Sequence, residues 1–344
     1  MNFFFIIVAI LFNAASILAA EQPAFTLFTE FGNDIWKIYS SGKIESILGN
    51  ESGINTPSGN IYFNTTAPVP SPDNKYVAFI KHNDLWLRDM KTGKSSRLTH
   101  AGKQDTGEYA SIEVYITSWA SDSRSILYHI GHGMTEDLDG VQPDRKVLEA
   151  DYGFHIYNLD KKNSRRVSLP EGILLKWLPD HRFLYSMDDY IIIYSTDGRS
   201  EILTAANATG IQTDISRDGK HLLIADGNLK MRTSQIIKVD LATRKISPVT
   251  PKGSWADYQY PRFSRSGAQI SFLKRTGQVR GHPTVSLIID GREVYKHTGS
   301  IVYSWIDETA IALIYIREDN MLGIMVLDTG TNKIKAEHKV KRQI

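Results

Sequence analysis

The sequence contains no cysteine among its 344 residues. This absence excludes a disulfide-stabilised scaffold, a thiol nucleophile and every metal site that uses a cysteine ligand. Neither sign of charge dominates, because 40 Lys and Arg residues are balanced by 38 Asp and Glu residues, and no long basic run occurs. We therefore expect no nucleic-acid partner, since proteins that bind nucleic acids usually carry a clear basic excess or stripe.

Long hydrophobic runs are also missing, apart from one at the N-terminus. Residues 3–12 are apolar without interruption, and Asn13 and Ser16 then break the run. A membrane-spanning helix needs about 20 apolar residues, whereas the core of a signal peptide needs about 7–15. We therefore interpret residues 1–20 as a signal peptide, with an uncleaved N-terminal anchor as the alternative. Residues 21–344 would then form a single domain in the bacterial periplasm or outside the cell, with no membrane span after cleavage.

Helical periodicity is the third absence, because no stretch shows a sustained apolar period of 3.6 residues. This argues against parallel βαβ folds. A short β-rich unit recurs instead, and its clearest copy runs from Val69 to Thr99. The first turn of each copy has an equivalent position, and these positions recur every 38 to 58 residues, at Asp73, Asp122, Asp180, Asp218, Ser266 and Glu308. Four-stranded propeller blades typically repeat every 40–50 residues or so.

The recurring unit predicts an all-β fold, a β-propeller of four-stranded antiparallel blades. Turn signals such as Ser-Pro-Asp, Asp-Gly and Thr-Gly separate its strands. A single sheet of this kind cannot bury both faces, but radial packing against neighbouring blades does so. Three earlier segments, 25–31, 34–39 and 43–48, look like the last three strands of another blade. We predict seven blades, the first incomplete, or six, with Trp119 and Trp177 packed between blades.

One copy of the unit carries a more specific resemblance. Its segments Ser71–Phe79, Asp84–Leu87, Thr92–Gly93 and Arg97–Thr99 resemble the PD40, or WD40-like, repeat of TolB-type propellers. In that family, such blades occur in TolB, in prolyl-oligopeptidase-type peptidases and in some polysaccharide lyases. The resemblance implies a propeller fold. The sequence differs from TolB in that we expect no counterpart of the separate N-terminal domain that TolB carries. A Gly-x-Ser-x-Gly elbow is absent, so no peptidase activity and no catalytic residue is predicted.

The loops of a propeller blade alternate between two rims, and this alternation predicts where a ligand binds. The strand 1–2 and strand 3–4 turns share one rim, and here they are short and uniform. The strand 2–3 loops and the blade-to-blade connections share the other rim, and they hold the length variation: residues 49–66, 100–113, 129–153, 226–234, 250–260 and 274–283. Because variable loops on a rigid scaffold often bind, we predict that this long-loop face of a monomer binds an envelope protein or a saccharide or peptide ligand.

The candidate binding residues lie on those connections. The longest connection and the start of the strand after it contribute His129, His132, Glu136, Asp137, Asp139, Asp151 and His155. The other connections contribute Trp255, Tyr258, Arg275, Arg280 and His282. Imidazole and carboxylate groups suit zinc or manganese, but their spacing matches no recognised motif. We therefore predict no cofactor, and keep as an alternative a divalent metal near His129, His132 and Asp139. That metal would make the protein a metal-assisted carbohydrate-active lyase or hydrolase.

Overall fold

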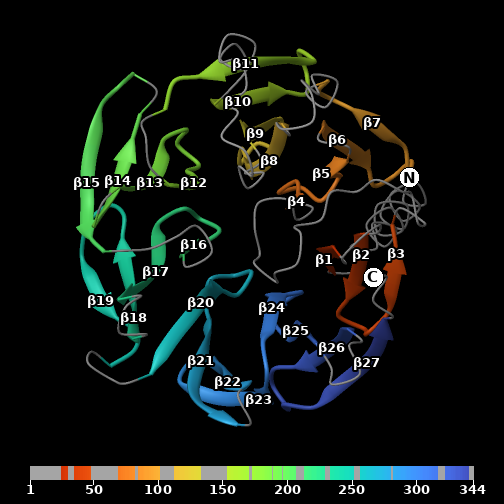
Figure 1. Cartoon of the computed structure of the whole chain (residues 1–344), viewed down its shortest axis with the longest axis vertical. Coiled ribbons are helices and arrows are strands. Elements are labelled where there is room, and N and C mark those ends of the chain that lie inside the picture. The colour runs from red at the N-terminus through yellow and green to blue at the C-terminus, as the bar shows by residue number, and fades with distance from the viewer. Residues whose placement is uncertain are drawn as a thin grey trace, which may run out of the picture.

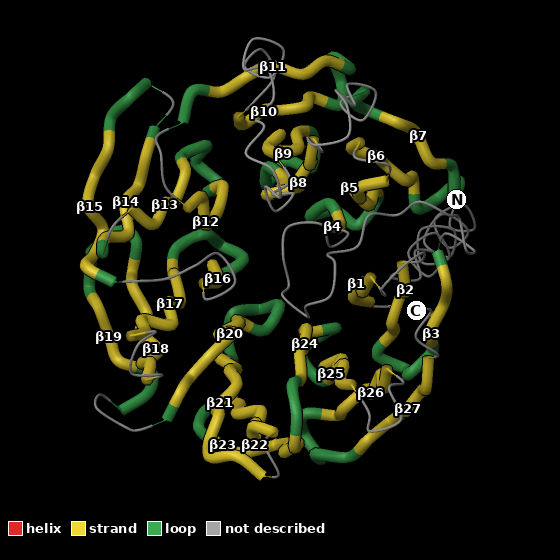
Figure 2. The backbone as a smooth tube through the Cα atoms, viewed as in Figure 1, coloured by secondary structure: helices red, strands yellow, loops and turns green. Residues whose placement is uncertain are grey.

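The structure, a computed structural model, describes fourteen segments of the chain: residues 25–29, 35–47, 69–81, 84–100, 112–132, 153–169, 173–187, 189–195, 197–206, 213–228, 233–251, 256–279, 282–316 and 322–340. Strands and turns make up these segments, and no helix occurs in them (Figure 2). The described part of the chain accordingly contains no apolar helix with the length of a membrane span. The predicted signal peptide, residues 1–20, lies outside the described residues.

The strands form seven antiparallel sheets, each made of consecutive strands. We call the three-stranded sheet sheet 1 and the six four-stranded sheets blades 2 to 7. Sheet 1 comprises β1 (Phe25–Thr29), β2 (Ile35–Tyr39) and β3 (Ile44–Ser46). Blade 2 comprises β4 (Val69–Pro70), β5 (Tyr76–Lys81), β6 (Asp84–Asp89) and β7 (Ser95–Arg97); blade 3 comprises β8 (Ile112–Trp119), β9 (Ser125–His132), β10 (Gly153–Asn158) and β11 (Asn163–Val167).

The remaining blades follow the same order. Blade 4 comprises β12 (Ile173–Trp177), β13 (Phe183–Met187), β14 (Tyr190–Tyr194) and β15 (Ser200–Ala205). Blade 5 comprises β16 (Thr213–Ile215), β17 (His221–Asn228), β18 (Thr233–Asp240) and β19 (Ile246–Pro248). Blade 6 comprises β20 (Asp257–Phe263), β21 (Ile270–Val279), β22 (His282–Ile289) and β23 (Arg292–Thr298); blade 7 comprises β24 (Ile301–Trp305), β25 (Ala310–Ile316), β26 (Leu322–Asp328) and β27 (Ile334–Val340).

The sheets are arranged radially around one axis, which confirms the predicted β-propeller (Figure 1). The first strand of each four-stranded blade lies nearest the axis and the fourth lies at the outside (Figure 1). Sheet 1 occupies the sector between blade 7 and blade 2, and has three strands where the other sheets have four. The two blade counts left open by the sequence therefore differ only in whether this incomplete sheet is counted.

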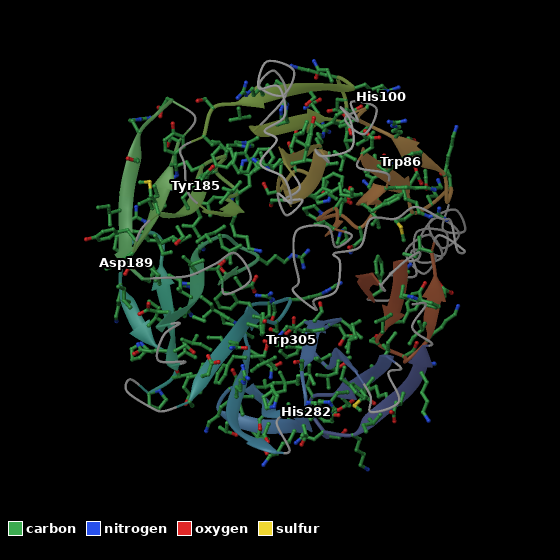
Figure 3. All side chains as sticks on the ribbon, viewed as in Figure 1. Trp86, His100, Tyr185, Asp189, His282 and Trp305 are labelled. Carbon is green, nitrogen blue, oxygen red and sulfur yellow. The ribbon has the colours of Figure 1, made fainter. Side chains whose placement is uncertain are left out.

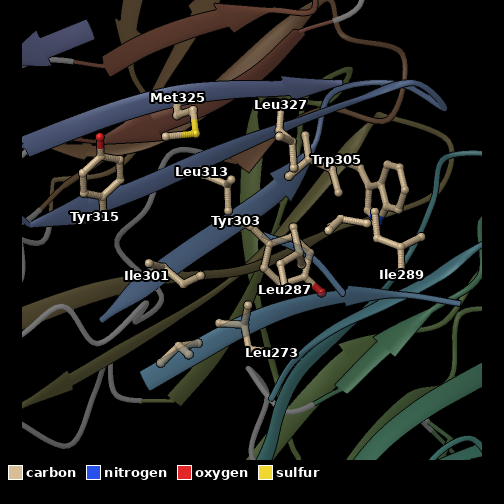
Figure 4. Close-up of a cluster of buried hydrophobic side chains, with 13 residues drawn as sticks. Leu273, Leu287, Ile289, Ile301, Tyr303, Trp305, Leu313, Tyr315, Met325 and Leu327 are labelled. Carbon is tan, nitrogen blue, oxygen red and sulfur yellow. The ribbon is translucent and has the colours of Figure 1, made fainter. Parts of the chain in front are cut away.

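The core consists of seven hydrophobic clusters, one at each interface between neighbouring sheets. Successive side chains of a strand point to opposite faces, so a strand between two neighbours must be apolar on both faces. On β17, Leu222 packs toward blade 4, while the next residue, Leu223, packs toward blade 6. This explains the continuous apolar runs of the second strands. Figure 4 shows the largest cluster, which joins blades 6 and 7 around Tyr303 and Trp305.

The aromatic residue at the end of the first strand also packs between blades, as predicted. Trp119 is buried, and its Nε1 donates a hydrogen bond across the interface to the carbonyl oxygen of Val69 (2.9 Å). Trp305 is buried likewise, and its Nε1 donates to Ser271 Oγ of the neighbouring blade (2.8 Å). Trp177 is only partly buried and stacks on Phe183 of its own blade, with ring centroids 5.8 Å apart.

The strand 1–2 turn is held by a hydrogen-bond pattern that recurs between blades. In blade 2, the Tyr76 N–H donates to Ser71 Oγ (3.0 Å), and that hydroxyl donates to Asp73 Oδ1 (2.7 Å). Blade 5 repeats both bonds with His221, Ser216 and Asp218. Ser and Asp side chains satisfy turn backbone in this way, so the Ser-x-Asp repeat has a structural role.

The Asp…Arg-Leu-Thr part of the repeat is structural too. In blade 2, Asp84 is buried and forms an ion pair with Arg97. Thr99 Oγ1 donates to Asp84 Oδ1 (3.0 Å) and accepts from the Leu85 N–H (2.9 Å). These contacts tie the start of the third strand to the segment that follows the fourth strand, and therefore fix the exit of the chain toward blade 3.

The ring closes by packing of whole faces, because β1 to β3 pair only with one another among the described strands. Ile38 of β2 is buried in the cluster of blade 7, while Ile47 packs against Val77 and Phe79 of blade 2. Gly42 lies against β27, where His338 Nε2 is 2.9 Å from its carbonyl oxygen.

Candidate functional site: the strand 2–3 rim

The strand 2–3 connections of the blades leave from one rim, because the blades share one strand order around the axis. The connection after β9 and the connection after β21 both join a second strand to a third strand. The ends of these two strands therefore face the same side of the propeller. We call this side the strand 2–3 rim, and the opposite side, which carries the strand 1–2 and 3–4 turns, the turn rim.

The connections are shorter in the structure than the sequence predicted, because parts of them belong to strands. Residues 129–132 belong to β9, residues 226–228 to β17, and residues 274–279 to β21. Residues 257–260, expected as a connection, form the start of β20. These strands therefore extend further than predicted, because polar side chains near the end of a strand interrupt the apolar alternation by which a strand is recognised.

Two of the predicted histidines lie on paired strands of blade 3, not on a loop. His129 of β9 packs against Phe154, with ring centroids 4.7 Å apart, and His155 of β10 stacks on Tyr128 at 5.3 Å. Burial, with a smaller contribution from His155, lowers the pKa of His129. A lowered pKa favours the neutral imidazole at neutral pH, the form that also ligates metals.

The proposed metal ligands are only partly in view. Glu136, Asp137, Asp139 and Asp151 lie outside the described residues, and of His132 only the backbone, at the end of β9, is described. Within the described segments, no group of three or more potential metal ligands converges. A metal near His129, His132 and Asp139 therefore stays a prediction, which elemental analysis of the purified protein tests.

The aromatic and basic candidates separate into buried and exposed residues. Tyr258 is buried and packs edge-on against Phe272, so little of its ring is accessible from the rim. Arg275 is partly exposed and lies opposite Asp257 in the pairing of β20 with β21. His282 is exposed at the start of β22 (Figure 3). Two further candidates, Trp255 and Arg280, lie outside the described residues.

A polar group joins blades 5 and 6 beside these residues. Ser234 Oγ donates to Asp257 Oδ1 (3.1 Å) and accepts from the Tyr258 N–H (2.5 Å). Gln259 Nε2 donates to Asp257 Oδ2 (2.5 Å). Asp257 therefore receives hydrogen bonds from two blades, and with Arg275 on the paired strand it gives this part of the rim both signs of charge.

The sequence did not identify the most exposed apolar residues of the rim. Met187 ends β13 and Tyr190 begins β14, and their exposed fractions are 39% and 46%. The other exposed large hydrophobic residues of the described part lie on the outermost strands of their blades: Ile202, Ile246 and Ile334. The sequence carried one signal of this exposure: an apolar residue lies on each side of the strand 2–3 turn of blade 4, a place where polar residues are usual.

Asp189, which lies between these two residues in blade 4 (Figure 3), has an exposed side chain. Its carbonyl oxygen accepts the Ala206 N–H (3.0 Å), which fastens the hairpin to the chain segment that leaves blade 4. The hairpin therefore presents an exposed acidic residue and two exposed apolar side chains beside this backbone hydrogen bond.

Comparisons with known proteins agree with this architecture. The N-terminal region of dipeptidyl peptidase IV (DPP IV) is a family whose sequence profile matches residues 43–128. No curated protein matches the sequence. The chain is similar to the structure of an oligogalacturonate lyase in complex with manganese, with a TM-score of 0.54 and 13% identity over 82% of this chain and 79% of that one.

Two further solved structures extend the comparison. An acylaminoacyl peptidase of Pyrococcus horikoshii has a TM-score of 0.54 and 14% identity, over 93% of this chain and 52% of the peptidase chain. A putative TolB from Agrobacterium tumefaciens has a TM-score of 0.46 and 16% identity, over 81% of this chain and 91% of that one. The chain is a β-propeller with TolB proteins among its structural neighbours. At these identities the similarity concerns the fold, and fold alone does not define activity.

Proposed function

We propose that this protein is an exported binding or scaffolding propeller, whose strand 2–3 rim holds an envelope protein or a saccharide or peptide ligand. No bond is made or broken in this role. The observation that carries the proposal is the exposure of Met187 and Tyr190 at the tip of one strand 2–3 hairpin. Met and Tyr are enriched in protein interfaces, where burying their apolar surface contributes to affinity.

The turn rim supports the same assignment by contrast. Its Ser and Asp side chains bond to their own turns, as in Ser71 with Asp73 and Ser216 with Asp218. A polar group that already has its hydrogen-bond partner within the turn gains less from contact with another molecule than a group whose hydrogen bonds are incomplete. The strand 2–3 rim, by contrast, presents the exposed apolar side chains of Met187 and Tyr190, of the residue types that are enriched in protein interfaces.

The test compares two double variants with similar exposure. Met187→Ser/Tyr190→Ser removes the apolar tip, while Ile246→Ser/Ile334→Ser removes exposed side chains from two outermost strands and serves as the control. A photo-crosslinking amino acid at position 189 first identifies the partner in the envelope fraction of the source cells. The affinity of the purified partner is then measured by surface plasmon resonance.

We expect the tip variant to weaken binding by about thirtyfold, since a dominant interface residue contributes about 2 kcal/mol or more. The control should bind as tightly as the unmodified protein. Equal affinity of the tip variant and the unmodified protein would refute the assignment to this hairpin. Greater weakening in the control would assign binding to the outer strands instead.

A further inference from the structure

A further exposed feature lies on β15, the outermost strand of blade 4. Its residue Ile202 has an exposed fraction of 63%, the highest among the large hydrophobic residues that the structure describes. Among the described strands, the fourth strand of each blade pairs only with the third, so it forms an edge of the sheet. Figure 1 shows β15 at the periphery of the ring. Backbone N–H and C=O groups on the outer side of an edge strand can pair with another chain.

The outermost strands of the other five blades carry features that oppose such pairing. Short length, proline and charged side chains all have this effect. β7 and β19 are three residues long and include Arg97 and Pro248, respectively. The longer strands β11, β23 and β27 each carry two or more charged residues: Arg165 and Arg166; Arg292, Glu293 and Lys296; Lys335, Glu337 and Lys339. By contrast, β15 has six residues, contains no proline and carries one charge, that of Glu201.

The single charge of β15 is paired within the protein. Arg244, in the strand 3–4 turn of blade 5, forms an ion pair with Glu201, and its Nε donates to Glu201 Oε1 (3.0 Å). Arg182 Nη1 of blade 4 lies 3.9 Å from Glu201 Oε2. A carboxylate that is already close to two guanidinium groups opposes an incoming chain less than an isolated charge does. The edge of β15 is therefore nearly uncharged.

Ile202 continues the exposed apolar surface of the hairpin tip, Met187 and Tyr190, to this edge. Met187 pairs with Tyr190, and Ile192, two residues after Tyr190, pairs with Ile202. Paired residues, and residues two apart along one strand, share a face of the sheet. Met187, Tyr190 and Ile202 therefore lie on one face of blade 4. The inner part of the same face is buried against blade 3 through Tyr185 and Ile192, so the apolar surface extends from the core to the edge strand.

We propose that β15 binds an extended peptide segment of a partner protein, which pairs with the edge of blade 4 as a fifth strand. The proposal rests on the proposed binding role and names the chemistry of the partner, a segment in which apolar and polar residues alternate. Ser200–Ile202, all exposed, precede the register shift of β15 and would supply the backbone hydrogen bonds. Apolar side chains beside Ile202 would supply specificity. An extended segment fits because a fifth strand continues both the sheet and its apolar surface.

The probe is a fluorescein-labelled octapeptide in which valine alternates with threonine, residues that favour extended backbone. Two matched peptides carry N-methyl groups, one on its valines and the other on its threonines. In a strand, residues whose N–H groups point to one edge also share a face, so each methylated peptide loses the donors of one edge and keeps every side chain. Fluorescence anisotropy measures the affinity of the three peptides for the full chain.

The variants change exposed isoleucines on two outermost strands. Ile202→Lys introduces the kind of charge that protects natural edge strands, and Ile202→Thr removes most of the apolar surface without adding a charge. Ile334→Lys is the matched control, because Ile334 is an exposed residue of β27. Substitutions of exposed residues usually change the free energy of unfolding little, and thermal unfolding checks that each variant folds.

We expect Ile202→Lys to weaken binding of the octapeptide by at least about tenfold, as for loss of one buried aliphatic side chain. Ile202→Thr should have an intermediate affinity, and Ile334→Lys should bind as the unmodified protein does. One methylated peptide should bind like the octapeptide and the other should not bind, because an added strand uses the donors of one edge. Amide hydrogen exchange should slow in residues 200–205 when the octapeptide binds, and stay unchanged in residues 334–340.

Four results would overturn the proposal. The first is that the octapeptide binds the unmodified protein no more tightly than it binds Ile202→Lys. The second is that Ile334→Lys weakens binding as much as Ile202→Lys does. The third is that methylation weakens binding of both peptides or of neither, since pairing along one edge affects one of them. The fourth is that the unmodified protein dimerises in analytical ultracentrifugation while Ile202→Lys stays monomeric, which would assign the edge to a second copy of this chain.

Failure of this proposal is distinguishable from failure of the proposed function. If Met187→Ser/Tyr190→Ser keeps its affinity for the crosslinked envelope partner while Ile202→Lys loses the octapeptide, the tip assignment is wrong and the edge assignment stands. If the tip variant loses the envelope partner while Ile202→Lys binds the octapeptide normally, the edge assignment is wrong and the tip assignment stands.

Discussion

The two rims of the propeller are built by the same strands, yet they differ in how their polar groups are used. On the turn rim, Ser71 and Ser216 close their turns with the same hydrogen bonds in two different blades. On the strand 2–3 rim, the residue that begins the third strand differs between blades, from the buried Asp84 of blade 2 to the exposed Tyr190 of blade 4. The turns of one rim therefore stabilise the repeat in a common way, whereas the hairpins of the other rim differ from blade to blade.

The largest expected effect tests the interior that both rims share. Trp119→Ala should destabilise the protein by about 3–5 kcal/mol, the usual cost of deleting a buried aromatic residue. It also leaves the carbonyl oxygen of Val69 without its indole donor. Tyr190→Ala, on the strand 2–3 rim, should change the free energy of unfolding by less than about 0.5 kcal/mol. Urea denaturation measures the free energy of unfolding of both variants. Similar losses in Trp119→Ala and Tyr190→Ala would show that the interior is no more sensitive to substitution than the rim.

The second test asks whether the strand 2–3 rim is free to vary in every blade. Asp84→Asn should cost about 3 kcal/mol, because it leaves the partly buried guanidinium of Arg97 without its anionic partner. Asp180→Asn, which breaks an exposed ion pair with Arg182, should cost less than about 1 kcal/mol. A loss of less than about 1 kcal/mol in Asp84→Asn would mean that the buried ion pair of Asp84 with Arg97 stabilises the protein no more than an exposed ion pair does.

The third test concerns the seam between sheet 1 and blade 7. Gly42 has a φ of +90°, and a Cβ there would collide with the Cβ of Ala336. Gly42→Ala should therefore cost about 1–3 kcal/mol through overpacking, in addition to backbone strain. Gly198→Ala is the matched control, since its φ is +88° and no atom lies within 4 Å of the added methyl.

The Gly198 variant should lose only about 1 kcal/mol, from the backbone conformation alone. Combining Gly42→Ala with Ala336→Gly should recover part of the loss, because the two methyl groups no longer collide. Thermal unfolding of the three variants and the unmodified protein measures this recovery. Equal losses for Gly42→Ala and Gly198→Ala, with no recovery in the double variant, would show that the seam is loosely packed.

The smallest effect concerns pH and a strand 3–4 turn. The Thr331 N–H donates to Asp328 Oδ1 (2.8 Å), and this bond with that of the Thr331 hydroxyl lowers the pKa of Asp328 to about 2. A carboxyl whose pKa is lower in the folded state stabilises that state above its unfolded pKa, near 4, and this contribution is lost as the pH falls toward 2. Acid unfolding of Asp328→Asn should therefore differ from the unmodified protein above about pH 4, and the difference should shrink toward pH 2.

Glu293→Gln, at an exposed carboxylate of β23, is the control for this titration. Its acid-unfolding curve, recorded over the same pH range, shows how much of the effect comes from the loss of one surface charge. If the difference caused by Asp328→Asn persists unchanged down to pH 2, the turn is stabilised by something other than the ionised carboxylate.

The sequence predicted the fold well because the fold depends on repeated local signals. The Ser-x-Asp turns and the residues before them, such as Trp119 and Trp305, mark one end of each blade, and the structure confirms their packing. The site was less accessible to prediction. Exposure of Met187 depends on where a hairpin ends relative to its neighbours, and burial of Tyr258 depends on Phe272 of the next strand. Such contacts between strands leave no pattern in either segment alone.

The way the ring closes has a consequence for how the chain folds. Within each sheet, strands pair only with their neighbours in sequence, so every hairpin closes a modest loop. Contacts between the two ends of the ring, such as His338 with Gly42, are the long-range exception. Local contacts form quickly and long-range contacts form slowly. We therefore expect blades 2 to 6 to assemble in succession, while sheet 1 is the last to gain its second neighbour, because it must wait for blade 7.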